Sequence, residues 1–112
     1  MDKTYKDFGE AVEALRQERR MSYDTVAFGI QHPQSYVYGI CTRRKRNLPN
    51  YEQMKEFADF FHVEPEYFYE WRLKKMLEFV NNNREFLDHC QQESKKYIKK
   101  KDKIQGAENE SA

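Results

Sequence analysis

The sequence has few cysteines, few glycines and no long apolar run, and each shortage excludes a class of protein. Its two cysteines, Cys41 and Cys90, form no CxxC pair, so neither a disulfide framework nor a zinc site is expected. None of the four glycines belongs to a GxGxxG phosphate loop. No apolar run approaches the ~20 residues of a membrane span, and residues 1–4 lack an apolar signal region. We therefore expect a cytoplasmic protein with reduced thiols, no membrane contact, no metal and no cofactor.

The chain also lacks an excess of charge of one sign. Twenty Lys and Arg against nineteen Asp and Glu give a net charge of +1, which argues against polyanion binding by bulk charge, so any nucleic-acid surface must be local. Two basic clusters can supply one: the run 43–46 and the lysines between Lys95 and Lys103. A hydrophobic content of 38% in 112 residues allows one small core. The segment 105–112 contains no aromatic residue and is expected to be a disordered tail.

No strand-like alternation is long enough for a sheet, whereas apolar residues recur at helical spacing over most of the chain. Helix starts are predicted at the capping residues or first-turn prolines Thr4, Ser22, Pro33, Asn50 and Pro65. The fourth helix has the clearest stripe, formed by Met54, Phe57, Ala58 and Phe61. The fifth should continue through Leu73, Met76, Leu77 and Val80 and break at Asn81–Asn83, before a weaker amphipathic helix over Phe86–Ile98.

The second and third helices are short and separated by a tight turn, an arrangement that lets one helix brace on a phosphate backbone while the other enters a major groove. Small Ala27 suits the point where the two helices cross. The apolar residues Val26, Ile30, Val37 and Ile40 would pack beneath them, leaving Gln34, Ser35, Tyr38, Gly39 and Thr42 on the outer side of the third helix.

With these features the sequence resembles the Cro and phage-repressor family, also called the XRE family, over about half of its length. The matching residues are Leu15-Arg16, Glu18-Arg19, Met21-Ser22, Val26-Ala27, Ile30, Ser35-Tyr36-Val37, Ile40, Lys45-Arg46, Leu48-Pro49, Met54, Phe57-Ala58, Val63, Pro65 and Tyr67-Phe68. The resemblance implies an all-α protein. It would contain a five-helix lambda-repressor-like DNA-binding domain over residues 4–70 and a C-terminal helical extension over residues 71–104, followed by the tail 105–112.

The resemblance further implies a recognition helix over Pro33–Thr42. Its base-contacting residues would be Gln34, Ser35, Tyr38 and Thr42, and the phosphate-contacting residues would be Ser22, Tyr23, Arg43, Arg44, Lys45 and Arg46. Gln34 is the best candidate for direct readout, because its amide can donate and accept together at adenine. Two residues depart from the family pattern: Gln31 replaces the usual glycine of the turn, and Gly39 weakens the helix by ~1 kcal/mol. Either the turn is reshaped or the helix becomes rigid only on DNA.

The sequence thus predicts a sequence-specific double-stranded DNA-binding transcriptional regulator. It would act as a homodimer held by the helix after Pro65 and by residues 86–98. The alternative is an antitoxin-like or adaptor protein whose segment from Arg84 binds a protein partner, since the imperfect apolar stripe of that segment suits folding on a partner. An enzyme is not expected, because no nucleophile has a base nearby and the three histidines lack ligand spacing.

Overall fold

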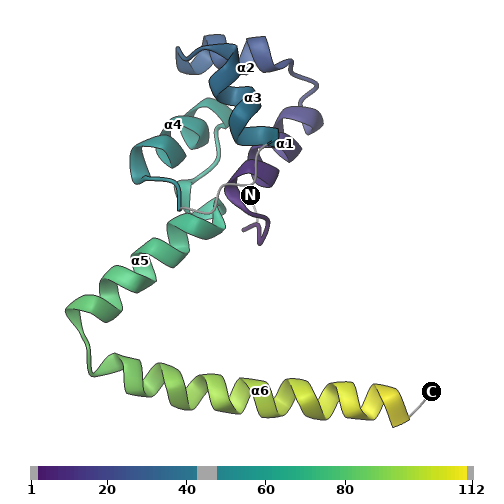
Figure 1. Cartoon of the computed structure of the whole chain (residues 1–112), viewed down its shortest axis with the longest axis vertical. Helices are drawn as coiled ribbons and strands as arrows, with labels where there is room; N and C mark the ends of the chain where they lie inside the picture. The colour runs from purple at the N-terminus through teal and green to yellow at the C-terminus, as the bar shows by residue number, and fades with distance from the viewer. Residues whose placement is uncertain (1–2, 43–47, 111–112) are drawn as a thin grey trace. The chain divides into compact units, whose positions relative to one another are not determined.

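The computed structural model describes residues 3–42 and 48–110, with side chains as far as Ile104, and all regular structure in these ranges is helical (Figure 1). The elements in chain order are α1 (Phe8–Glu18), α2 (Tyr23–Ile30), α3 (Gln34–Thr42), α4 (Tyr51–Phe61), a 3₁₀ turn η1 (Pro65–Tyr67), α5 (Tyr69–Asn82) and α6 (Phe86–Glu110). The all-α class predicted from the sequence is confirmed.

Two of the predicted helix caps are confirmed in the structure. Ser22 Oγ accepts a hydrogen bond from the Thr25 amide at 3.1 Å, at the start of α2. Asn50 Oδ1 accepts one from the Gln53 amide at 2.7 Å, at the start of α4. Each side chain satisfies an amide that has no partner within the first turn of its helix, so α2 and α4 begin where the sequence predicts.

The cap predicted at Thr4 is wrong, because α1 begins later. Asp7 is the N-cap, and its Oδ1 accepts from the Glu10 amide at 2.9 Å. Glu70 of α5 adds a second carboxylate: its Oε2 accepts from the Phe8 amide at 2.6 Å, although the Glu70 side chain is buried. Burial raises the pKa of Glu70, and the hydrogen bond from Phe8 opposes that rise. The start of α1 is therefore fixed by α5.

The core lies among α1 to α4 and Phe68, and it contains the predicted stripes of the first four helices. Its largest fully buried side chains are Phe57, Phe61, Phe68, Leu15, Met54, Val12, Val26 and Val37. The rings of Phe57 and Phe68 both meet the Phe8 ring edge-on, with centroids 5.5 and 4.9 Å from it. These contacts join α1 to α4 and to the segment after η1, so one core holds the N-terminal elements together.

The single fifth helix predicted from Pro65 is wrong in its first turn. Residues 65–67 form η1, and Phe68 leaves the helical conformation with φ −78° and ψ 133° before α5 begins at Tyr69. This bend buries the Phe68 ring completely. Core packing of one aromatic side chain therefore outweighs the continuity of the helix.

The chain divides into two compact units, residues 1–75 and 76–112. In the second unit, α5 ends at Asn82 and α6 begins at Phe86, so the break predicted at Asn81–Asn83 is confirmed. The α5 residues Met76 and Leu77 are half-exposed, at 52% and 50%, and are not core residues. The backbone of α6 continues into 105–112, where disorder stays a prediction.

Candidate nucleic-acid interface

The turn between α2 and α3 has a left-handed residue at the end of α2. Gln31 has φ 58° and ψ 46°, and its amide donates to the Phe28 carbonyl at 3.3 Å. The next amide, that of His32, donates to the Ala27 carbonyl at 3.0 Å, which completes a Schellman-type end. The turn thus has the geometry that usually calls for glycine, with glutamine at a conformational cost of roughly 1 kcal/mol. The departure at Gln31 does not reshape the turn.

The inner face of α3 packs on α1 and α2. Val37 and Ile40 are buried, and a Cβ atom at Gly9 of α1 would overlap the Ile40 carbonyl oxygen. The two backbones therefore approach more closely than any side chain at Gly9 would allow. This close approach fixes the distance of α3 from the core.

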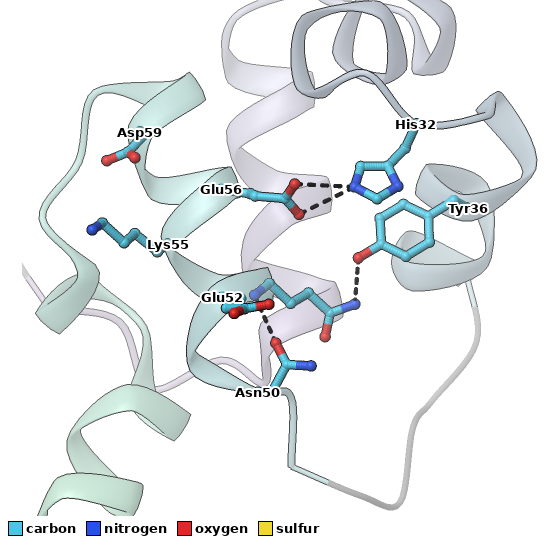
Figure 2. Close-up of a pocket in the computed structure, with 8 residues that line it drawn as sticks. His32, Tyr36, Asn50, Glu52, Lys55, Glu56 and Asp59 are labelled. Carbon is cyan, nitrogen blue, oxygen red and sulfur yellow. Dashed lines mark hydrogen bonds and ion pairs between the residues drawn. The ribbon is translucent and has the colours of Figure 1, made fainter.

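The beginning of α3 is tied to α4 by polar and aromatic contacts (Figure 2). His32 Nε2 lies 3.1 and 3.2 Å from the two carboxylate oxygens of Glu56, and its ring stacks on Tyr36 with centroids 4.2 Å apart. The Tyr36 hydroxyl accepts a hydrogen bond from Gln53 Nε2 at 2.8 Å. Burial raises the pKa of Tyr36, so this hydroxyl stays protonated at neutral pH. These residues hold the first turn of α3 at a set orientation.

A second network holds the middle of α3 to the start of α2. The Tyr23 hydroxyl donates to Glu13 Oε2 at 3.1 Å, and the Arg16 guanidinium lies over the Tyr23 ring, 4.0 Å from its centroid. Arg16 also donates to Glu13 and lowers the pKa of that carboxyl to about 2. The Tyr23 ring in turn meets the Tyr38 ring edge-on at 5.3 Å. Tyr38 is thereby oriented by three residues of α1 and α2.

The outer face of α3 carries the residues predicted to contact bases. Gln34, Ser35, Tyr38 and Thr42 are all exposed. Among the residues that the structure describes, neither Gln34 nor Ser35 has a side-chain hydrogen-bond partner. The Thr42 hydroxyl donates to the Tyr38 carbonyl at 2.6 Å and is used within the helix. None of the nine residues of α3 is charged. The helix therefore presents hydrogen-bonding side chains but no charged side chain.

The residues predicted to contact phosphate fall into two groups. Ser22 is exposed but caps α2, and the Tyr23 hydroxyl is bound to Glu13, so both already have an intramolecular role. The contact between Tyr23 and Tyr38 brings the start of α2 beside the middle of α3. Arg43, Arg44, Lys45 and Arg46 lie outside the described residues.

The supporting residues were not found from the sequence. Glu13 and Arg16 have the spacing of a helical ion pair, which could have indicated their contact. Gln53 and Glu56 give no such signal, because their partners Tyr36 and His32 lie 17 and 24 residues away. Only the folded arrangement of α3 against α4 brings these side chains together.

Comparisons with protein-family models, curated proteins and solved structures gave no match. Within residues 3–42 and 48–110, no three His, Cys, Asp or Glu side chains are grouped as metal ligands would be. In the same part of the chain, no helix has both the length and the apolar character needed to cross a membrane.

Proposed function

We propose that this chain is a sequence-specific double-stranded DNA-binding transcriptional regulator of the Cro and phage-repressor type. In this proposal its N-terminal helices are a five-helix lambda-repressor-like domain, and the segment Pro33–Thr42 enters the major groove. One observation carries it: α3 is held from beneath and from both sides, while Gln34 and Ser35 on its outer face have no described partner. Readout of bases requires such a pre-oriented helix with free hydrogen-bonding groups.

Because α3 has no charged side chain, we assign base reading to α3 and phosphate contact to residues outside it. An uncharged helix gains little from counterion release, so its contribution is discrimination between bases and not general affinity. In the proposal Gln34, Ser35, Tyr38 and Thr42 face base edges. Affinity comes from phosphate contacts of Ser22 and Tyr23 and of Arg43, Arg44, Lys45 and Arg46.

A single helix of this size reads too few base pairs for useful specificity. The proposal therefore includes a homodimer whose two copies of α3 enter successive major grooves about 34 Å apart. Such a dimer binds a two-fold symmetric site, and its operator should show two half-sites separated by one helical turn.

Selection from random DNA duplexes at a stated salt concentration tests this function directly. We expect an enriched sequence with two-fold symmetry. Gln34→Ala should then lose about 5- to 150-fold in affinity for each half-site and relax the preference at one position of each half-site. Gln92→Ala, which removes an exposed glutamine from α6, is the matched control and should change neither quantity.

Two results would contradict the proposal. In one, the selection enriches no sequence over many rounds, although the protein is folded. In the other, a double variant with alanine at Gln34 and Tyr38 keeps both the affinity and the sequence preference of the unmodified protein. The salt dependence gives a further check on phosphate contact: Arg44→Gln should reduce the slope of log K against log salt by about 1 for each subunit, or about 2 for the dimer.

The exposed apolar side chains of α6 favour a second candidate function, that of an antitoxin-like or adaptor protein. Leu87, Tyr97 and Ile98 are 49%, 66% and 56% exposed, as expected of a segment that folds against a partner. Deleting the residues after Asn83 separates the two functions. Loss of a co-purifying protein would support the adaptor, whereas loss of dimer mass alone would support dimerisation.

A further inference from the structure

Helix α6 is long, and most of its described side chains are exposed. It spans 25 residues, Phe86–Glu110, and every side chain from Gln91 to Ile104 is exposed. An isolated helix of mixed composition is only marginally stable in water, and most helices in proteins depend on packing of an apolar face. Within residues 91–104 no side chain of α6 is covered by the rest of its own unit, so this helix has an apolar side left for a partner.

Four apolar residues of α6 lie on a heptad spacing whose other two positions are polar. Alternating steps of three and four residues join Leu87, Cys90, Ser94, Tyr97, Lys101 and Ile104, and we name this set the seam. The same steps lead back across the break through Asn83 to Val80 and Met76 in α5. Four of the lysines, Lys95, Lys96, Lys99 and Lys103, fall at positions b, c and f, away from the seam. Apart from Lys101, these charges lie outside a narrow stripe, which is the pattern of a two-stranded coiled coil.

We propose that α6 pairs with α6 of a second copy of this chain, parallel and in register, as a coiled coil along the seam. The parallel orientation rests on the proposed function, because it leaves both N-terminal units at the same end of the coil. An antiparallel pair would separate the two copies of α3 and prevent them from entering successive grooves of one site. Ser94 and Lys101 weaken the seam, and polar residues at such core positions fix register and strand number.

The exposed apolar area is of the size that such a dimer needs. Four large side chains of α6 are between 49% and 66% exposed: Leu87, Tyr97, Ile98 and Ile104. At roughly 200 Å² for a large side chain, they offer on the order of 450 Å² of apolar area per chain. A standard interface buries ~800 Å² per partner, of which a little over half is apolar. A membrane surface suits this helix less well, because Ser94 and Lys101 interrupt the apolar face that would have to enter the lipid.

Cys90 provides a direct test of the register. With helix axes ~8–10 Å apart and Cα atoms ~2.3 Å from each axis, the two copies of Cys90 would have Cα atoms about 5 Å apart, within disulfide range. Mild oxidation of the full chain, without DNA, should therefore give a disulfide-linked dimer on a non-reducing gel. Cys90→Ser should abolish it. Cys41 should not replace Cys90, because burial and a hydrogen bond to Glu13 raise the pKa of its thiol to about 12.

Two further cysteine positions distinguish the seam from other faces of α6. In the Cys90→Ser background, Ser94→Cys lies in the seam and should cross-link, whereas Gln92→Cys lies on the outer face, about 14 Å from its counterpart, and should not. Light scattering on the unmodified chain should give a dimer mass, and Tyr97→Lys should shift it to the monomer. Circular dichroism would show whether the remaining helices persist in each variant.

A monomer at all concentrations would overturn the proposal, and so would a dimer in which Gln92→Cys cross-links as readily as Ser94→Cys. Binding of the monomer to anionic vesicles, or to a different protein, would also overturn it. These outcomes are independent of DNA binding. A cross-linked dimer that selects no DNA sequence would refute only the proposed function, and a monomer that still selects one would refute the coiled coil and the homodimer but not sequence-specific DNA binding.

Discussion

Gly39 offers a sharp test of how α3 is placed, because the space beside it is open. A Cβ atom built there meets no atom within 4 Å, and the residue lies in the interior of α3. Glycine in a helix interior costs about 1 kcal/mol relative to alanine. Gly39→Ala should therefore raise the free energy of unfolding by about 1 kcal/mol, with no opposing steric cost.

Urea denaturation measures this change. For a small domain with an m-value of ~1–2 kcal/mol/M, the midpoint should rise by about 0.5–1 M at constant m, and thermal unfolding should shift upward by roughly 4–8 °C. Gly9→Ala is the matched control, since its Cβ would overlap the Ile40 carbonyl oxygen. That variant should be destabilised by ~1–3 kcal/mol. The same substitution of glycine by alanine should thus raise the free energy of unfolding at Gly39 and lower it at Gly9.

A destabilised Gly39→Ala variant, or a neutral Gly9→Ala variant, would refute the described packing of α3. The open space at Gly39 also connects stability with function. Gly39→Leu should keep the gain in helix propensity, yet a bulky side chain on the outer face should block entry into the groove. Equal affinity of Gly39→Leu and the unmodified protein for the selected DNA would argue against α3 as the recognition helix.

Four other substitutions test the supports of the site. Gln31→Gly should raise the free energy of unfolding by about 0.5–1 kcal/mol in urea, because glycine adopts φ 58° without strain. Tyr36→Phe should cost ~0.5–1.5 kcal/mol in the same assay, since it removes the acceptor for Gln53. Glu70→Ala should cost ~1–3 kcal/mol because the Phe8 amide loses its partner; an unchanged urea midpoint would show that water replaces the carboxylate. The pKa of the Glu13 carboxyl is lowered from its ordinary value of 4.5 to about 2. At pH values above 4.5 the ionised carboxylate therefore stabilises the fold by on the order of 1–2 kcal/mol after solvent screening. Urea unfolding should show that this stability is lost as the pH falls from 4.5 through about 2, and that Glu13→Gln lacks the loss.

The sequence predicted α2, α3 and α4 well because local signals agree there, whereas it placed the start of α1 too early. Ser22 and Asn50 cap their helices as expected, and the stripe from Met54 to Phe61 is fully buried. The exposed face of α3 follows from the same periodicity, since the burial of Val37 and Ile40 leaves Gln34 and Ser35 outside. Periodicity and capping therefore sufficed to predict which residues α3 presents.

Long-range contacts explain what the sequence did not predict. Within two residues of their ends, α1, α2 and α4 are each followed by a non-glycine residue in the left-handed conformation, namely Arg20, Gln31 and His62, so the usual glycine signal for a helix end is missing. The buried carboxylate of Glu70 and the bend at Phe68 depend on contacts with Phe8, about 60 residues away. The interactions that hold the ends of these elements are therefore set by the tertiary fold and leave no local pattern.

The two ends of α3 are supported in different ways, and this difference decides which residues can be altered independently of the fold. Tyr36 is half-buried between His32 and α4, whereas Tyr38 is half-exposed and rests on Tyr23. Substituting Tyr38 would therefore disturb the Tyr23 contact as well as any base contact, and the two effects would be mixed. Gln34 has no described partner to lose. A change in DNA preference after substitution of Gln34 can thus be attributed to the reading surface itself.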